Sequence, residues 1–281
     1  MLGFIIFCLA QSGYAQSKPE RRIRLPDALS EVSGLYYASR DSLWWHNDSG
    51  DAPNLYLTDG EGHLLFTLEL PQLRNVDWED LTADDQGNLY IGDFGNNLRN
   101  RQDLKVYRVH LSSREVDSIA FQFPDWQSGK GLDTEAFFWH RDSLHLFTKS
   151  QIPKGNYYTK HYALADHGNQ QVADFRDSIR LKRRAITGAA IDPNTGMVAL
   201  VGYNYGFFLG LIPHSAASVF FLNQYPEGHY LQGTCRRRKI SCLWGLQYES
   251  IDFVDKKYLY VAAEKTLWIK AKAKRKKRKK D

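Results

Sequence analysis

The sequence predicts an all-β fold, a five-bladed β-propeller whose blades are four-stranded antiparallel sheets. No stretch carries apolar residues at the i, i+3, i+4, i+7 spacing of an amphipathic helix. Short runs of aromatic and β-branched residues recur instead, separated by turns rich in Asp, Gly and Asn. A two-strand phrase occurs five times, and its equivalent positions Ser33, Glu79, Glu135, Thr187 and Glu249 are 46, 56, 52 and 62 residues apart. This period matches one propeller blade, which buries its two faces against its neighbours.

Each repeat is expected to supply the two inner strands of a blade, and the segments that follow supply the two outer strands. The repeats occupy residues 31–48, 76–94, 132–150, 185–203 and 247–264. The outer strands of the first four blades are expected at 54–59 and 64–70, 104–111 and 118–124, 156–164 and 177–181, and 206–212 and 236–241. A sixth blade is the alternative, because residues 203–245 form a long stretch.

The fifth blade is expected to draw its strands from both ends of the chain. Residues 247–264 supply two strands and residues 266–272 a third, after which the sequence offers no fourth. Residues 22–26 (RIRLP) alternate charged and apolar residues and belong to no other blade. We expect this N-terminal strand to complete the fifth blade and close the ring, which removes an exposed sheet edge.

The N-terminus precedes the predicted propeller domain, which spans residues 16–272. Residues 2–10 are an apolar run, and Gly13 and Ala15 follow at the spacing of a signal-peptidase site. We therefore expect residues 1–15 to be a cleaved signal peptide and the protein to be secreted or periplasmic in a bacterium. The run is too short for a transmembrane segment, which needs about 20 residues.

The net charge of +5 is distributed unevenly along the chain. Residues 270–281 hold nine Lys or Arg and one Asp, so the remainder has 28 positive and 31 negative residues. This balance lacks the spread of basic residues over folded elements that specific nucleic-acid binding requires. We expect residues 273–281 to be a disordered basic tail, which either stays solvated or contacts an anionic surface.

Two cysteines, Cys235 and Cys242, remain after removal of the predicted signal peptide. In an oxidising compartment they can form a disulfide across a hairpin. Two free thiols are the alternative, because the sequence does not fix the distance between the two Cα atoms.

A ring of carboxylates is expected in the central channel. The first strand of each propeller blade lines this channel, so residues at one repeat position surround the axis. Glu79, Glu135 and Glu249 are three of these residues, and Ser33 and Thr187 complete the ring. The carboxylates repel one another unless protons or a cation neutralise them. Calcium, which takes roughly six to eight oxygen ligands in irregular geometry, suits such a site better than magnesium. The alternative is that the glutamates cap strands or pair with Arg and Lys.

The second strands end in polar residues that are expected at one rim of the propeller, beside this ring. They are Asn47, Asp48, Asp93, Lys149 and Glu264. With aromatic residues nearby, such a rim can bind a polar small molecule or a protein partner. The alternative is that Asn and Asp are present for turn geometry.

The repeat phrases resemble those of the bacterial SdiA-regulated propellers, which are distantly similar to NHL-repeat and gluconolactonase-type propellers. The phrases are VSGLYY, WEDLT with LYIGDFGNN, TEAFF, TGAAID, and YESIDF with LYVAAE. The resemblance covers roughly residues 22–272 and implies five blades and a calcium ion at a shared site. By position it assigns Glu79, Glu135 and Glu249 to that site, whereas Ser33 and Thr187 depart from the acidic pattern.

Two functional classes remain open. The first is a calcium-binding module for a polar ligand or a protein. The second is a metal-dependent hydrolase, lactonase-like or phosphoesterase-like, in which the cation polarises a carbonyl or phosphoryl oxygen and Lys149 or Asp93 handles the proton. The sequence has no G-x-S-x-G, H-E-x-x-H, P-loop or G-x-G-x-x-G motif, so we assign no catalytic residue. His145 alternates with apolar residues and is expected to be packed in the core.

Overall fold

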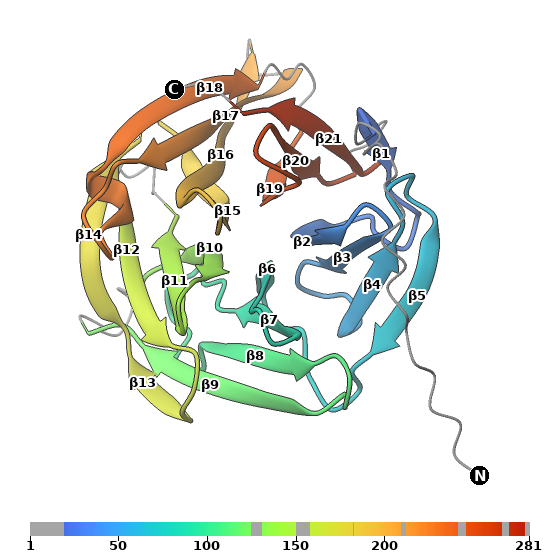
Figure 1. Cartoon of the computed structure of the whole chain (residues 1–281), viewed down its shortest axis with the longest axis horizontal. Coiled ribbons are helices and arrows are strands. Elements are labelled where there is room, and N and C mark those ends of the chain that lie inside the picture. The colour runs from blue at the N-terminus through green and yellow to red at the C-terminus, as the bar shows by residue number, and fades with distance from the viewer. Residues whose placement is uncertain are drawn as a thin grey trace.

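A computed structural model describes residues 20–124, 131–149, 158–181, 183–208, 212–240, 246–265 and 270–278. Five sheets surround a central axis, which confirms the predicted five-bladed β-propeller (Figure 1). The described residues contain almost no helix, and none of their helices has the length and apolar character needed to cross a bilayer. Residues 1–15 and Cys242 lie outside the described residues, whereas Cys235 is exposed.

The blades follow one another in chain order, from the innermost strand outward. Blade 1 is β2 (Val32–Ser39), β3 (Ser42–Asn47), β4 (Asn54–Thr58) and β5 (Leu64–Glu69). Blade 2 is β6 (Trp78–Ala83), β7 (Asn88–Asp93), β8 (Lys105–His110) and β9 (Val116–Gln122). Blade 3 is β10 (Thr134–Trp139), β11 (Ser143–Thr148), β12 (Tyr158–Ala165) and β14 (Asp174–Arg180). Blade 4 is β15 (Ala185–Asp192), β16 (Met197–Phe208), β17 (Ile212–Asn223) and β18 (Thr234–Ile240). Blade 5 is β19 (Tyr248–Phe253), β20 (Tyr258–Ala263), β21 (Lys272–Lys277) and β1 (Arg22–Arg24).

The ring closes through the N-terminal strand, as predicted. Strand β1 pairs antiparallel with β21, and Ile23 lies opposite Ala273. Both side chains are fully buried in the core between blades 5 and 1. One addition was not expected: β13 (Gln170–Val172), in the connection between β12 and β14, pairs parallel with β9 and adds a fifth strand to the sheet of blade 2.

The expectation of a disordered tail at residues 273–281 is wrong for its first five residues. They belong to β21 (Lys272–Lys277), so the third strand of blade 5 lies beyond the expected segment 266–272 and the domain extends past residue 272. The physical reason is an alternation of lysine with alanine. Ala273 is buried against the core, and the lysines on either side belong to the opposite face of the strand and are half-buried.

The third strand of blade 4 also differs from its expected place. Residues 206–212 contain the connection between β16 and β17 rather than a strand of their own. Strands β16 and β17 are each 12 residues long and pair over almost their whole length. This long hairpin and β18 (Thr234–Ile240) account for most of the stretch between residues 203 and 245. The length of that stretch was the reason for considering a sixth blade.

The core consists of five apolar clusters, and each cluster fills the space between two neighbouring blades. Between blades 2 and 3, for example, Phe94, Phe121 and Phe137 pack edge to face. The other clusters fill the remaining four interfaces in the same way. Every blade therefore has both faces covered by its neighbours.

Side chains also link the innermost strands, whose inner edges have no strand to pair with. Asp80 on β6 accepts hydrogen bonds from the N–H groups of Leu81 (2.9 Å), Phe137 (3.2 Å) and Ala189 (3.1 Å). It thereby joins blades 2, 3 and 4 at the axis. Further links run from Ser33 Oγ to the Glu79 carbonyl, from Trp139 N–H to Thr82 Oγ1, from Thr187 Oγ1 to the Tyr248 carbonyl, and from Tyr37 N–H to Asp252 Oδ2.

A candidate acidic site at one mouth of the channel

The five residues at the repeat position lie on the five innermost strands. Ser33 is on β2, Glu79 on β6, Glu135 on β10, Thr187 on β15 and Glu249 on β19. Each is the second or third residue of its strand, so all five belong to the same end of the channel. The three glutamates are almost inaccessible, with exposed fractions of 6%, 2% and 7% in chain order.

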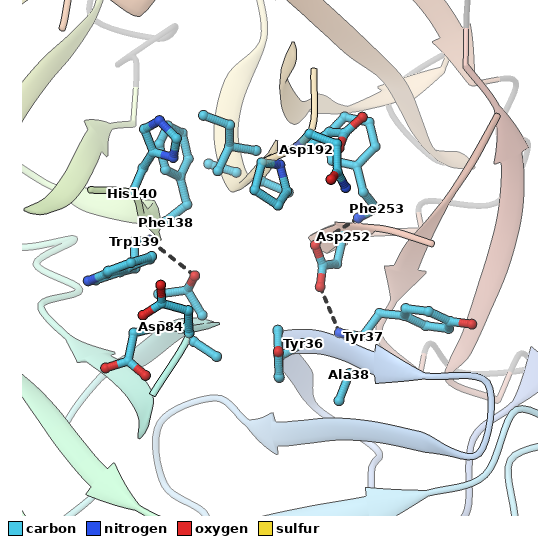
Figure 2. A pocket seen from close by; sticks show the side chains of 18 of the residues that line it. Tyr36, Tyr37, Ala38, Asp84, Phe138, Trp139, His140, Asp192, Asp252 and Phe253 are labelled. Atoms are coloured by element: carbon cyan, nitrogen blue, oxygen red, sulfur yellow. Dashed lines mark hydrogen bonds between the residues drawn. The ribbon is translucent and has the colours of Figure 1, made fainter. Parts of the chain in front are cut away.

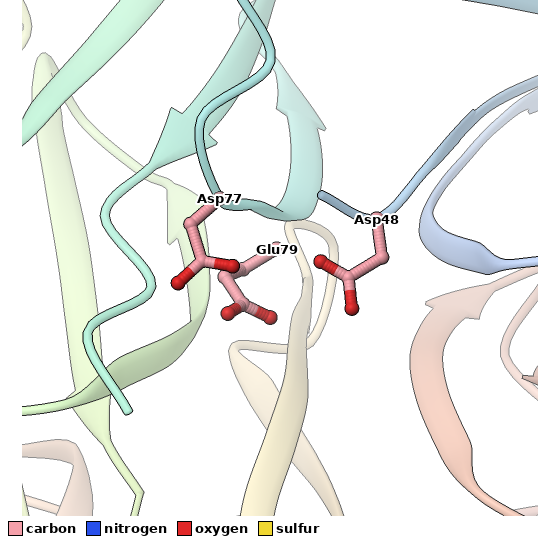
Figure 3. A group of neighbouring side chains, drawn as sticks. All are labelled: Asp48, Asp77 and Glu79. Carbon is pink, nitrogen blue, oxygen red and sulfur yellow. The ribbon is translucent and has the colours of Figure 1, made fainter. Parts of the chain in front are cut away.

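The structure does not bring the three glutamates together as one set of ligands. Glu135 forms an ion pair with Lys149 Nζ, and Glu249 accepts a hydrogen bond from the Tyr203 hydroxyl at 2.8 Å. Glu79 lies instead beside Asp48 and Asp77. One carboxylate oxygen from each of these three residues lies within 4.8 Å of the other two, and Figure 3 shows the three groups turned toward one another.

Sequence reasoning missed Asp77, although a signal was present. Asp77 precedes β6, and Glu79 follows it by two residues, the spacing that places side chains on one side of an extended chain. Asp48 reaches the same place from blade 1, because it follows the last residue of β3. The group therefore combines the end of a second strand in one blade with the start of a first strand in the next.

Gly95 leaves the space that the carboxylates occupy. A Cβ atom at this position would collide with the carboxylate oxygens of Glu79 and Asp77. Arg101 holds this backbone in place, since its Nη1 donates to the Gly95 carbonyl at 2.9 Å and its Nη2 to Asp93 Oδ1 at 3.0 Å. Arg101 is a second residue that sequence reasoning missed, and only the folded loop after β7 reveals its contacts.

Burial and mutual repulsion disfavour the ionised forms of these carboxyl groups. Burial, with the negative charge of Asp48, raises the pKa of Asp77 to about 6. Burial, with the charges of Glu135 and Asp48, raises the pKa of Glu79 well above its usual value. The site therefore needs protons or a cation for neutralisation.

Lys149 supplies one positive charge beside this site. Burial lowers its pKa, but the charges of Glu135, Asp133 and Glu79 outweigh that effect and hold the pKa above its usual value. The lysine is therefore protonated at neutral pH. Its ion pair is with Glu135, and its charge also opposes the effect of burial on the pKa of Glu79 and of Asp48.

The remaining rim residues make defined contacts. Asn47 donates to the Ala28 carbonyl at 2.7 Å and to Asp51. Asp93, fully buried, accepts from Arg101 and from the Asp77 N–H at 3.1 Å. These two residues therefore support the loops around the site.

Glu264 belongs to the acidic surroundings of the same channel mouth. It accepts from Gln247 Nε2 at 2.5 Å. Burial and the charge of Glu249 raise the pKa of Glu264 to about 8. Of the five predicted rim residues, Asp48, Lys149 and Glu264 thus place ionisable side chains beside the ring of glutamates, and the carboxyl group of Glu264 is mostly protonated near pH 7.

A cavity of about 760 Å³ occupies the opposite mouth, at the far ends of the innermost strands. Aromatic side chains and aspartates line it, among them Tyr36, Trp139, Phe253 and Asp252 (Figure 2). Burial raises the pKa of Asp252 to about 7, although its carboxylate accepts the Tyr37 N–H at 2.6 Å. This cavity is therefore at the opposite mouth from the rim where ligand binding was expected.

His145 is packed in the core, as predicted. Its Nδ1 lies 3.0 Å from His161 Nε2, and His161 Nδ1 lies 3.0 Å from Asp177 Oδ1. The exposed fractions of the two histidines are 6% and 0%. Burial and the neighbouring His161 hold the pKa of His145 well below its usual value, and burial lowers the pKa of His161 despite Asp177.

These histidines give a testable pH dependence. Because the folded pKa lies below the unfolded value of about 6.5, the unfolded chain takes up more protons as the pH falls below that value. The histidine contribution to stability is therefore complete above about pH 6.5 and declines below it. We expect the stability of the wild type to fall more steeply than that of His145→Gln between about pH 7.5 and 5, as measured by urea unfolding. Parallel profiles would contradict this expectation.

No known protein-family model matches the sequence, and no curated protein matches it. Solved structures are similar in three dimensions. A glucose dehydrogenase has a TM-score of 0.50 and 12% identity over 92% of this chain and 99% of its own. An exo-β-1,3-galactanase from Phanerochaete chrysosporium has a TM-score of 0.54 and 11% identity over 91% of this chain and 64% of its own. Virginiamycin B lyase from Staphylococcus aureus has a TM-score of 0.47 and 8% identity over 92% of this chain and 88% of its own.

At these identities the similarity shows the β-propeller fold alone, because unrelated functions share this fold. The resemblance of the repeat phrases to the SdiA-regulated propellers stays a prediction.

Proposed function

We propose that this protein is a secreted propeller that holds a calcium ion at Asp48, Asp77 and Glu79 and binds a polar ligand or a protein at the same mouth of the channel. The observation that carries the proposal is the convergence of three carboxylates from two blades, with oxygens within 4.8 Å of one another. The apolar leader predicted at residues 1–15 supports export. The resemblance to SdiA-regulated propellers, whose members hold calcium, supports the choice of ion.

The donor set fits a hard cation. Three carboxylates offer oxygen ligands only, and they can supply up to about six of the roughly six to eight that calcium takes. Gly95 leaves the room that such a group needs, since a side chain there would displace the Glu79 and Asp77 carboxylates. A bound cation would stabilise the ionised forms of Asp77 and Glu79 against their burial.

At this mouth of the channel the polar ligand would contact both negatively and positively charged groups. Asp48 is partly exposed, and the Lys149 side chain is 23% exposed beside it. A calcium ion held by Asp48 would keep a position open toward solvent, which a carbonyl, hydroxyl or carboxylate of the ligand can occupy. Lys149 would contact an acidic or carbonyl group of the same ligand.

Binding has more support than hydrolysis, because neither proton-handling candidate is suited to that role. Lys149 is ion-paired with Glu135, and its pKa lies above the usual value. Asp93 is fully buried, and its carboxylate accepts hydrogen bonds from Arg101 and the Asp77 N–H. A general base near neutral pH needs a free lone pair within reach of the reacting proton.

Calcium is expected to raise the melting temperature of the purified protein. At 100 times the dissociation constant the ion stabilises the folded state by about 2.7 kcal/mol, which corresponds to roughly 5–10 °C for a domain of this size. Differential scanning calorimetry in calcium, in magnesium and in EDTA measures the shift. Asp77→Asn should remove most of it.

Glu249→Gln is the matched control, because it changes a buried carboxylate of the same channel that lies outside the proposed ligand set. The shift should survive this substitution. If Glu249→Gln abolished the shift and Asp77→Asn left it intact, calcium would bind the predicted ring of glutamates and not this group. No shift in the wild type, together with no calcium by elemental analysis, would exclude the calcium site altogether.

A further inference from the structure

The outer strands of blades 4 and 5 are unusually basic. Strands β18 (TCRRRKI), β21 (KAKRKK) and β1 (RIR) contain 11 Lys or Arg among 16 residues, and no Asp or Glu. Blades 4 and 5 are neighbours in the ring (Figure 1). The basic residues of the C-terminal segment therefore join those of two other strands in a folded surface.

Protection of sheet edges does not account for this charge. Lysine on an edge strand prevents pairing with other chains, but that need is the same in every blade. The fourth strands of blades 1 to 3, counted outward from the axis, are β5, β9 and β14, and together they contain two Lys or Arg and four Asp or Glu. The concentration of positive charge is thus specific to one side of the propeller.

One basic row belongs to the face of blade 4 that looks toward blade 5. Arg236 lies opposite Phe221 and Arg238 opposite Val219 in the β17–β18 register. Directly opposite residues share a face of an antiparallel sheet, and Phe221 and Val219 belong to the core between blades 4 and 5. Arg236 and Arg238 therefore lie on the same side of blade 4 as this core, one strand farther from the axis.

A second basic row belongs to the facing side of blade 5. Lys272 lies opposite Ala263 and Lys274 opposite Val261 in the β20–β21 register. Ala263 and Val261 belong to the same core between blades 4 and 5. The two rows of cations therefore belong to the facing sides of two neighbouring blades, farther from the axis than the core that these blades share.

Strand β1 extends the second row. Arg22 lies directly opposite Lys274, and Arg24 directly opposite Lys272. Like charges in these positions destabilise a sheet, and a bound polyanion would remove that repulsion. Arg22 and Arg24 are exposed, and the other four cations are half-buried. We name the surface formed by Arg22, Arg24, Lys272, Lys274, Arg236 and Arg238 the basic surface.

We propose that the basic surface binds a linear acidic polysaccharide. Alternate residues on a strand are about 6.6 Å apart, so each strand presents a regular row of charges, which suits a polymer with regularly repeated acidic groups. The 16 residues of the three strands include no aromatic residue, and binding of single-stranded nucleic acid relies on aromatic stacking of bases. Rows of charge on the facing sides of two blades also suit a narrow chain that contacts both blades better than they suit a flat membrane.

The test compares a triple variant with a control of equal charge. The variant carries Arg22→Gln, Arg24→Gln and Lys274→Gln. The control carries Lys160→Gln, Arg176→Gln and Arg180→Gln, which remove three cations from blade 3. The probe is a heparin dodecasaccharide, and calorimetry at several salt concentrations measures its affinity. We expect the triple variant to bind at least about 10-fold more weakly, with a shallower salt dependence, and the control to bind like the wild type.

Two further measurements keep the outcome decisive. At low salt the triple variant should melt no lower than the wild type, because it lacks the cross-strand repulsion. Heparin should raise the melting temperatures of the wild type and the control equally, and that of the triple variant by less. A dodecathymidylate and vesicles of phosphatidylglycerol serve as competing probes. Equal heparin affinity of the wild type and the triple variant would overturn the proposal. Tighter binding of the oligonucleotide or the vesicles than of heparin would also overturn it. These results do not depend on calcium at the other site.

Discussion

Asp80→Ala is expected to lower the free energy of unfolding by about 3 kcal/mol or more, since each of three buried N–H groups would lose its acceptor at about 1 kcal/mol or more. These groups belong to Leu81, Phe137 and Ala189, from three different blades. The melting temperature should fall by roughly 6–12 °C for a domain of this size. Chemical and thermal unfolding followed by tryptophan fluorescence measure the change.

Two further variants test whether the loss of stability comes from the hydrogen bonds of Asp80 to other blades or from any substitution near the channel axis. Asp80→Asn keeps one carbonyl acceptor and should cost less than Asp80→Ala. Burial already raises the pKa of Asp80 well above its usual value, so a neutral group is tolerated there. Thr82→Ala removes a single link, the bond from the Trp139 N–H at 3.1 Å, and should cost about 1 kcal/mol. If Asp80→Ala cost no more than Thr82→Ala, the role given to Asp80 would be wrong.

Removal of residues 272–281 is expected to destroy the cooperative unfolding of the whole propeller. The deletion removes β21, so that β1 loses its partner, β20 loses one of its two partners, and Ile23 loses its place in the core. Burial of one isoleucine alone contributes about 1.5–3 kcal/mol, and the backbone hydrogen bonds of two strand pairs are lost as well. Circular dichroism and limited proteolysis of the truncated chain measure the effect.

The control keeps the strand and removes its charge. Lys272→Thr, Lys274→Thr and Lys276→Thr together preserve the buried Ala273 and the backbone pairing, and threonine favours strands. This variant should stay folded and melt near the wild type. A truncated chain with an unchanged melting temperature would instead show that residues 272–281 are the solvated tail that their composition suggests.

The five blades were predictable because one strand phrase recurs at a blade-sized period. The same period placed Glu79, Glu135 and Glu249 on innermost strands, where the structure has them. The closing strand was also predictable, because residues 22–26 had the strand alternation and no other blade to join.

Local composition misled the sequence interpretation where tertiary contacts decide the structure. A run of lysines suggests a solvated segment, yet Ala273 of β21 and Ala271 just before this strand are buried in the core. The apolar residues 206–212 suggest one strand, yet pairing with β17 extends β16 into their region.

The acidic site itself depends on a contact that the repeat does not describe. Asp48 comes from the end of a second strand, and Asp77 and Glu79 come from the start of a first strand in the next blade. The repeat predicts which residues surround the axis, because these residues occupy equivalent positions. It does not predict that residues at different repeat positions in neighbouring blades, such as Asp48 and Asp77, lie close together. Only the twist and packing of the blades fix that distance.

Because the first and last described strands pair in one blade, the ring cannot close during synthesis until nearly the whole chain is available. Four blades can form in order as the chain emerges. Until blade 5 forms, the apolar face of blade 4 that packs against it stays exposed to non-native contacts. The final step joins residues at the greatest separation in the chain and has the largest loop-closure entropy. We therefore expect ring closure to limit the folding rate, and a circularly permuted chain that keeps blade 5 continuous to fold faster.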